Sequence, residues 1–241
     1  MEHDRYYIDG RPKAEVVELD REESHHLIHV RRGGVGDVVT LFDGVGNEYD
    51  AEILKARKGT ATLRVTASRA VNRELPYRLA LAFAPTKSQA MDDIVRRATE
   101  IGAAALQPLY CENSVVHYKD FARKCEKWRR TVIEACKQCG RNVLPEIATP
   151  ATISPFLERC GGSLVLIAHL SPEAKSIREC LSGASKPESV VCLVGPEGGF
   201  TEGEVALAVA AGARVVTLGP TRLRAETAAV AMLSAVTSFL L

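Results

Sequence analysis

The sequence predicts an α/β protein in which a small, β-rich amino-terminal domain precedes a mostly parallel sheet with helices on both faces. Over residues 1–72, short apolar runs are separated by glycine-containing turns, a pattern typical of the closely spaced strands of a small barrel. From residue 73 onward, strand-like apolar runs alternate with segments of helical periodicity, which favours a parallel sheet covered on both faces. We therefore expect two domains, 1–72 and 73–241, joined by a polar stretch that ends at Pro76.

The amino-terminal domain is expected to contain three strands and one helix. The strands are predicted at residues 16–19, 38–42 and 60–65, which are apolar runs bounded by turn-forming residues. Asp20 is a suitable N-cap for a helix over 22–30, because its side chain can accept a hydrogen bond from a free backbone N–H.

The carboxy-terminal domain is expected to alternate strands and helices along the chain. Buried-type apolar runs predict strands, and apolar residues three or four positions apart predict helices. The predicted strands are 77–84, 104–110, 163–168, 190–194 and 214–218, and the predicted helices are 91–101, 121–136, 202–211 and 226–239.

The composition is that of a globular protein without a general excess of charge. Of the 241 residues, 46% are hydrophobic and 25% are charged, and the formal net charge is +1, so a nucleic-acid surface must come from local clustering. No apolar run approaches the ~18–20 residues of a membrane span, and the polar start does not resemble an export signal. Seven scattered cysteines favour reduced thiols. We therefore expect a cytoplasmic protein with no membrane partner.

A glycine-rich motif follows the predicted strand at 190–194. Residues 195–199 read Gly-Pro-Glu-Gly-Gly, and Thr201 and Glu204 then have the spacing of a capping box that begins a helix. Glycines at the end of a strand let the backbone approach a ligand and offer bare amide donors, and open α/β sheets bind ligands at the carboxyl ends of their strands. On composition alone, a simple tight turn explains these residues equally well.

A second loop of this kind follows the predicted strand at 214–218. Residues 219–228 read Gly-Pro-Thr-Arg-Leu-Arg-Ala-Glu-Thr-Ala, so two arginines and a glutamate stand at the start of an alanine-rich helix. Such charges within an otherwise apolar segment predict either a functional site or a salt-bridged surface loop, and composition does not separate the two.

Taken together and in this order, the motifs resemble the family of bacterial 16S rRNA uracil-N3 methyltransferases, which belong to the SPOUT class. The resemblance covers nearly the whole chain. It also includes residues 25–31 and 41–44, Lys87 with 91–92 and 100–102, and the Gln-Cys-Gly-Arg-Asn sequence at 138–142. It implies a PUA-like RNA-binding β-barrel, then a SPOUT methyltransferase domain with a trefoil knot. It further implies a homodimer that uses S-adenosyl-L-methionine (SAM) to methylate N3 of a uridine in 16S rRNA of the small ribosomal subunit.

The resemblance also implies which residues hold SAM. The loop after the strand at 163–168, the glycine-rich loop and the loop before the last helix would line its pocket. The implied cofactor-binding residues are Leu170, Val194, Gly195, Pro196, Glu197, Gly198, Gly199, Leu218, Gly219, Leu223, Arg224, Thr227 and Ala228.

Arg224 and Glu226 are the candidate catalytic residues. Uracil N3 is protonated at neutral pH and must lose its proton before it attacks the methyl group, so a cation that stabilises the uracil anion would help. The forked guanidinium of Arg224 can bond two acceptors. Glu226 is either the base or the group that orients Arg224; we favour orientation, because an ordinary carboxylate is a poor base for a much weaker acid.

Basic residues in two regions are candidate RNA contacts. Residues 119–141 contain eight lysines and arginines against three acids, although a solvated helix face explains such a run equally well. A second group lies near the predicted amino-terminal helix. The candidate RNA-binding residues are His29, Arg31, Arg32, Lys87, Arg129 and Arg141.

The chain departs from the usual pattern of this family at three positions. Thr221 stands where the family often has arginine, and the nearest arginine is shifted by one position to Arg222. Lys137 stands where glutamate is frequent, and Asn113 where arginine is frequent. The Thr221 change touches the predicted cofactor pocket, and the other two would alter RNA contacts.

Two other functions fit the same residues. One is a methyltransferase of the same class that acts on another base or on a ribose 2′-hydroxyl, and the other is a non-catalytic RNA-binding factor in ribosome assembly. No metal site is expected. Cys136 and Cys139 form a single pair, whereas structural zinc needs four ligands.

Overall fold

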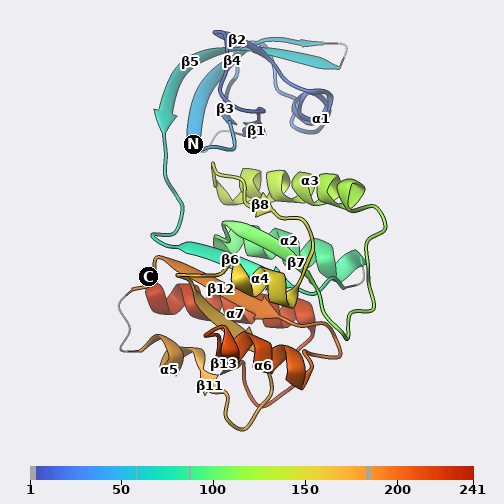
Figure 1. The fold of residues 1–241 in the computed structure, drawn as a ribbon. Helices are drawn as coiled ribbons and strands as arrows, with labels where there is room; N and C mark the ends of the chain where they lie inside the picture. Colours follow the sequence, from blue (N-terminus) through green and yellow to red (C-terminus); the bar gives the residue numbers. More distant parts are fainter. Residues whose placement is uncertain (1–3, 58, 87, 183–185) are drawn as a thin grey trace. The chain divides into compact units, whose positions relative to one another are not determined.

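The chain divides into two units in the computed structural model, which describes residues 4–57, 59–86, 88–182 and 186–241 (Figure 1). Unit 1 comprises Met1–Glu74 together with Cys136–Leu144, and unit 2 comprises Leu75–Ala135 and Pro145–Leu241. The sequence did not indicate that residues 136–144 would join the amino-terminal unit. The domain boundary at 72/73 stays a prediction.

Unit 1 is built on a five-stranded sheet with the order β1-β3-β4-β5-β2. Its strands are β1 (Arg5–Tyr7), β2 (Val16–Glu18), β3 (Val38–Phe42), β4 (Asn47–Arg57) and β5 (Thr60–Ala70). β1 pairs in parallel with β3, and the other pairs are antiparallel. The register of β4 against β5 shifts twice, and such bulges bend a strand pair; both strands are long and visibly bent in Figure 1. The bend lets one core form on a single side of the sheet, around Leu41, Ile53 and Leu63.

The predicted helix at 22–30 is present, but its second half is wider than an α-helix. In α1 (Arg21–His25), the Asp20 side chain accepts from the Glu23 N–H at 2.8 Å, as the sequence predicted for this cap. A π-helical segment, η1 (His26–Val30), follows, and there the N–H of Arg31 donates to the carbonyl of His26, five residues back. Leu27 in this segment is fully buried.

Glu48 is the centre of a buried ion cluster in unit 1. Its side chain is only 3% exposed, and it accepts from Arg5 at 2.5 Å, from Arg73 at 2.6 Å and from Arg69 at 3.2 Å. Burial acts to raise the pKa of Glu48, but the hydrogen bonds and charges of Arg5 and Arg73 outweigh it and lower the pKa to about 2. We call this group, with Arg5, Arg69 and Arg73, the Glu48 cluster.

The Glu48 cluster explains why residues 136–144 belong to unit 1. Arg5 also donates to the Asn142 side chain at 2.6 Å, and Asn142 donates to the carbonyl of Val71 at 3.0 Å. Val45 and Val143 form an antiparallel bridge. The Gly-Arg-Asn end of this segment is therefore fixed by polar bonds that hydrophobic periodicity does not report.

Unit 2 is built on an eight-stranded sheet in which every pair of strands is parallel. The order is β11-β13-β10-β12-β6-β7-β8, and β9 pairs with β7. The strands are β6 (Arg78–Phe83), β7 (Ala105–Tyr110), β8 (Glu146–Ile147), β9 (Ala151–Thr152), β10 (Leu164–Ala168), β11 (Lys175–Ser176), β12 (Ser189–Val194) and β13 (Arg214–Thr217). Because β10, β12 and β13 are adjacent, the loops that follow them leave the same edge of the sheet.

Helices cover both faces of this sheet, as expected for a parallel arrangement. They are α2 (Ser88–Ile101), α3 (Phe121–Cys139), α4 (Ile153–Glu158), α5 (Ile177–Leu181), α6 (Glu202–Ala210) and α7 (Ala225–Leu240). α7 packs on β6 and β12 with α2 and α5 beside it. On the other face, Phe156 of α4 and Val205 of α6 share a core with Leu193 of β12.

The expected architecture, a β-rich amino-terminal part followed by a parallel α/β part, is confirmed, and so is every strand and helix predicted above. The sequence missed β1 and β4, the two-residue strands β8, β9 and β11, and the short helices α4 and α5. Within the part of the chain that the structure describes, no helix has the length and apolar character needed to span a membrane. The trefoil knot stays a prediction.

Candidate functional site

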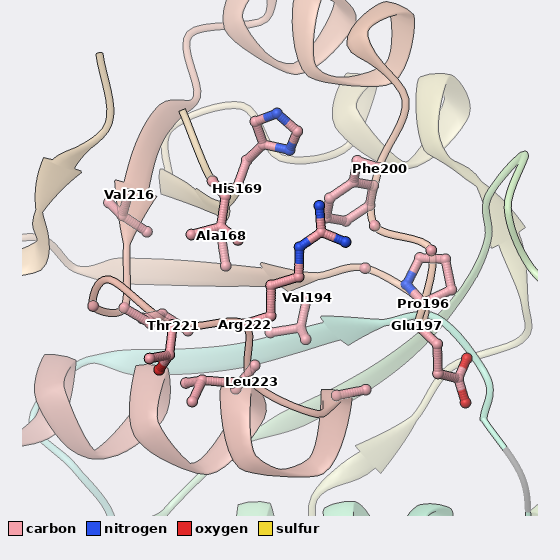
Figure 2. A pocket seen from close by; sticks show the side chains of 18 of the residues that line it. Ala168, His169, Val194, Pro196, Glu197, Phe200, Val216, Thr221, Arg222 and Leu223 are labelled. Atoms are coloured by element: carbon pink, nitrogen blue, oxygen red, sulfur yellow. The ribbon is translucent and has the colours of Figure 1, made fainter. Parts of the chain in front are cut away.

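A cavity of about 330 Å³ lies at the carboxyl edge of the unit 2 sheet (Figure 2). Its walls are the loops that follow β10, β12 and β13, together with the first turn of α7. These are the three loops that the sequence predicted to meet. We call this cavity the glycine-loop pocket.

The structure brings most of the predicted cofactor-binding residues together around this pocket. Those that line it are Leu170, Val194, Gly195, Pro196, Glu197, Gly198, Gly199, Leu218, Gly219, Leu223 and Ala228. Arg224 and Thr227 do not line it. The pocket also has lining residues that were not among the predicted cofactor-binding residues, namely Ala168, His169, Phe200, Glu202, Val216, Thr221, Arg222 and Ala225.

The glycine-rich loop is folded so tightly that a side chain at Gly195 would make close contacts within the loop. A Cβ on Gly195 would lie 3.1 Å from the backbone nitrogen of Phe200 and 3.3 Å from the carbonyl carbon of Gly199. Gly199 has a φ of +76° and donates to the carbonyl of Pro196 at 2.8 Å, which closes the turn in a backbone region that favours glycine. The loop therefore presents bare backbone to the cavity.

Glu204 fixes the position of the glycine-rich loop through hydrogen bonds. It forms the predicted capping box, in which its carboxylate accepts from the Thr201 N–H at 2.9 Å and the Thr201 hydroxyl accepts from the Glu204 N–H at 3.2 Å. The same carboxylate also accepts from the N–H of Glu112, in the segment after β7, at 2.9 Å. Glu204 is 3% exposed, so burial strengthens its effect on the loop position.

Asn113 also stabilises the same loop through side-chain hydrogen bonds. Its side-chain amide donates to the carbonyl of Gly199 at 3.1 Å and, more weakly, to that of Gly198 at 3.4 Å. A Cβ on Gly198 would meet the Asn113 Cβ at 3.1 Å. The residue that departs from the family pattern at this position thus supports the pocket wall from within unit 2.

Few charged side chains reach the pocket. His169 and Glu202 lie 3.6 Å apart, and Figure 2 shows the Arg222 side chain pointing into the cavity. Among the described residues, no carboxylate forms an ion pair with Arg222. The cavity therefore combines bare backbone, apolar walls from Val194, Leu218 and Leu223, and one available guanidinium.

The two candidate catalytic residues lie beside the pocket and do not contact each other. Arg224 occupies the N-cap position of α7 with an exposed side chain, and Glu226 is half-buried in the first turn. Within the described residues, neither side chain forms a hydrogen bond or ion pair. The orientation of Arg224 by Glu226 is therefore not seen in this structure.

The candidate RNA-binding residues fall into different settings. His29, Arg31 and Arg32 are exposed around the end of η1, and Arg31 lies 3.4 Å from Asp4. Arg129 is exposed on α3, and Lys87 lies outside the described residues.

Arg141 is a different case, because it is 4% exposed and its guanidinium is bound by Glu74. Its enclosure leaves it unavailable to a phosphate, so its role in the structure is to hold the 136–144 segment in unit 1. Among the described residues, no group of three or more His, Cys, Asp or Glu is placed to hold a metal ion.

The fold and the pocket define a class of protein: an α/β ligand-binding domain that follows a small β-domain. Comparison with known proteins is more specific. A family model described as an RNA methyltransferase domain matches residues 73–237, and one described as an RNA methyltransferase PUA domain matches residues 19–66. The chain belongs to this RNA methyltransferase family.

Curated relatives extend over almost the whole chain. A protein of Synechocystis sp. named ribosomal RNA small subunit methyltransferase E is 35% identical over 93% of this chain and 74% of its own length. A protein of the same name from Bacillus subtilis is 29% identical over 96% of this chain and 95% of its own length.

Solved structures agree with the fold. A methyltransferase of Legionella pneumophila in complex with the bound cofactor SAM is 33% identical, with a TM-score of 0.92 over 99% of this chain and 98% of that one. A ribosomal RNA small subunit methyltransferase E of Neisseria gonorrhoeae, bound to S-adenosyl methionine, is 29% identical, with a TM-score of 0.88 over 98% of both chains.

Proposed function

We propose that this protein transfers a methyl group from SAM to N3 of a uridine in 16S rRNA of the small ribosomal subunit. The observation that supports it most is the glycine-loop pocket, which lies in a chain whose full-length relatives bear the name ribosomal RNA small subunit methyltransferase E. The SAM complexes of two structural neighbours support the choice of cofactor.

The residues of the pocket fit SAM. Gly195 lets the loop fold closely against Phe200, and backbone amides of residues 195–199 can approach polar groups of the cofactor. Leu218 and Leu223 offer apolar walls for its adenosine, and Arg222 offers a guanidinium for its carboxylate. When bound, SAM supplies an activated methyl group, and the protein must hold the accepting nitrogen in line with it.

Arg224 is the residue that we propose for stabilising the uracil anion. It is exposed, and it lies between Leu223 and Ala225, which both line the pocket. Since N3 must lose its proton before it attacks, a cation beside the uracil oxygens lowers the barrier. Arg224→Ala is expected to reduce kcat with little change in SAM affinity, whereas Arg224→Lys should retain the charge but lose the two-point geometry. Unchanged methyl transfer by folded Arg224→Ala would exclude this role.

The decisive experiment has two parts. A calorimetric titration of the purified chain with SAM should show saturable binding, and nucleoside mass spectrometry of 16S rRNA should show 3-methyluridine only in cells that contain the protein. A ribose-methylated nucleoside in its place would favour the other methyltransferase function. Absence of saturable SAM binding would favour a non-catalytic RNA-binding role.

We further propose that residues 1–72 form the PUA-like RNA-binding domain, that residues 73–241 form the methyltransferase domain, and that the protein acts as a cytoplasmic homodimer. These proposals rest on the family resemblance. Analytical ultracentrifugation checks the dimer, since a single species at the monomer mass across the working concentration range contradicts it.

A further inference from the structure

Two adjoining hollows lie in unit 2, and no residue of either lines the glycine-loop pocket. The inner hollow, of about 270 Å³, has Thr86, Asp92, Tyr118 and Trp128 among its walls. The outer hollow, of about 460 Å³, is lined by four lysines and arginines, one histidine, one tyrosine and a single acid, Asp120. The hollows adjoin because Tyr118 and Lys124 line both.

The outer hollow carries positive charge that the protein does not neutralise. Lys119, Arg123 and Lys124 form no ion pair with any carboxylate of the described residues. The one acid of the hollow, Asp120, accepts from the Arg123 N–H at 3.1 Å, and its single charge is smaller than the summed charge of the three cations. Uncompensated cations around a concave surface favour an anionic ligand such as a phosphate.

The inner hollow differs from the outer one, because its walls include two aromatic side chains, and Thr86, Asp92 and Lys124 are polar or charged residues among them. Trp128 is 1% exposed and packs edge-on against Tyr118 at 5.5 Å between ring centroids. Thr86 is 2% exposed, yet its hydroxyl has no hydrogen-bond partner among the residues that the structure describes. Asp92 gives one carboxylate oxygen to Lys127 at 2.6 Å, which leaves its other oxygen to accept.

An unpartnered buried hydroxyl is uncommon, because burial without a hydrogen bond is unfavourable. Thr86 is one of the residues that line the inner hollow, which has a volume of about 270 Å³. A nucleobase has the matching chemistry: a flat face for the aromatic walls, an acceptor for the hydroxyl and an N–H for the carboxylate.

The position along the sheet suits an RNA substrate. Thr86 lies three residues beyond the end of β6, and Phe83 of β6 is in register with Val194 of β12, which leads into the glycine-rich loop. The inner hollow and the glycine-loop pocket therefore lie at the carboxyl ends of neighbouring strands. One RNA strand can then place its target base beside the pocket and another nucleotide in the hollows.

We propose that the two hollows form a second nucleotide subsite for single-stranded RNA. The base of an unstacked nucleotide enters the inner hollow against Tyr118, with its edge bonded to Thr86 and Asp92. Its phosphates lie in the outer hollow against Lys119, Arg123 and Lys124. The inference rests on the proposed function only in taking RNA as the ligand, and it does not depend on SAM.

The test of the outer hollow is the salt dependence of RNA binding. The full chain is titrated into a fluorescein-labelled, ten-nucleotide single-stranded RNA, and binding is followed by anisotropy at several salt concentrations. In Lys119→Ala/Arg123→Ala, the slope of log affinity against log salt should become shallower by about 1.4, since each phosphate contact with a single strand contributes about 0.7. Lys175→Ala/Arg178→Ala is the matched control, because it removes two exposed cations at the opposite edge of the sheet. Its slope should equal that of the unmodified chain.

The test of the inner hollow uses three substitutions and one modified RNA. Thr86→Val keeps the side-chain shape and removes the unpartnered hydroxyl, so the melting temperature should stay the same or rise while RNA affinity falls roughly 3- to 10-fold. Tyr118→Leu should weaken binding by about 10-fold or more through lost stacking, and Tyr118→Phe should restore it. An RNA with abasic sites should bind the unmodified chain as weakly as Tyr118→Leu binds normal RNA.

Several outcomes would overturn the subsite. They are no RNA binding at low salt, an unchanged salt slope in Lys119→Ala/Arg123→Ala, an unchanged affinity in Thr86→Val, or equal binding of the abasic RNA. A SAM titration of each variant runs in parallel. If the variants bind both SAM and RNA as the unmodified chain does, the subsite alone is rejected. If the unmodified chain does not bind SAM, the proposed function is rejected.

Discussion

The glycine-loop pocket and the Glu48 cluster reach a fixed geometry by opposite means. The pocket is shaped by the absence of side chains, because a Cβ on Gly195 would lie only 3.1 Å from the backbone nitrogen of Phe200. The cluster is shaped by charged side chains, since one 3%-exposed carboxylate accepts from three arginines. The pocket should therefore be sensitive to added volume, and the cluster to lost charge.

Removal of the central charge should have the largest effect. Glu48→Gln leaves Arg5, whose side chain is 9% exposed, without its anionic partner, and breaking a buried pair costs about 3–5 kcal/mol. Urea denaturation measures the loss. Glu52→Gln is the control, because the ion pair of Glu52 with Arg64 is long, at 3.8 Å, and exposed; its cost should stay within about 1 kcal/mol. Equal effects of the two substitutions would show that the cluster is not a stabilising centre.

Acid should remove the same stabilisation reversibly. The pKa of Glu48 is lowered from 4.5 to about 2, so the folded state gains from this group above pH 4.5 and loses the gain as the pH falls towards 2. At ~1.4 kcal/mol per pKa unit, the loss amounts to roughly 3 kcal/mol. The measurement is the difference in unfolding free energy between the wild type and Glu48→Gln, which should shrink over this pH range. A difference that stays constant from pH 5 to pH 2.5 would contradict the assignment.

Added volume should damage the pocket. Gly195→Ala forces the loop to shift, and overpacking of this kind costs about 1–3 kcal/mol, which corresponds to a roughly 5- to 150-fold weaker SAM affinity. Calorimetric titration measures it. Gly161→Ala is the matched control, because a Cβ there meets nothing within 4 Å and its φ is not in the left-handed region. Wild-type SAM affinity in Gly195→Ala would mean that the tight turn does not shape the cofactor site.

Loss of the Asn113 side-chain hydrogen bonds should have the smallest effect. Asn113→Ala removes the side-chain bonds to the carbonyls of Gly198 and Gly199, each worth about 0.5–1.5 kcal/mol at most on a partly exposed side chain. SAM affinity should fall a few-fold. Asn113→Asp should be worse, because a carboxylate would face two carbonyl oxygens. If the aspartate and alanine variants behaved alike, the amide of Asn113 would not be what holds the loop.

Hydrophobic periodicity predicted most of the fold but not the elements with weak patterns. The buried runs of β6, β10 and β12 and the apolar stripe of α3 are visible in the sequence because they bury whole faces. β4 was missed because charged residues interrupt its apolar positions, and β11 is only two residues long. Residues 136–144 belong to unit 1 because of polar contacts that involve Arg5, Asn142 and Glu48. These contacts follow no regular spacing in the sequence.

The parts of the site that could be predicted are those formed by residues close together in the sequence, namely the glycines and the capping box. Residues 195–199 and the capping box of Thr201 and Glu204 are readable from spacing alone. The bond from the Glu112 N–H to Glu204 spans 92 positions, and the inward direction of Arg222 depends on the path of its loop. The burial of Arg141 and its ion pair with Glu74 could not be predicted from its position in a basic run.

The pocket walls come from residues 168–228, and the strands that support them also include β6, which lies much earlier in the chain. During synthesis, no earlier portion of the polypeptide contains a complete cofactor site. A prematurely terminated product would therefore not withdraw SAM from the cellular pool. SAM binding can therefore be used to select complete, correctly folded molecules from a library of variants.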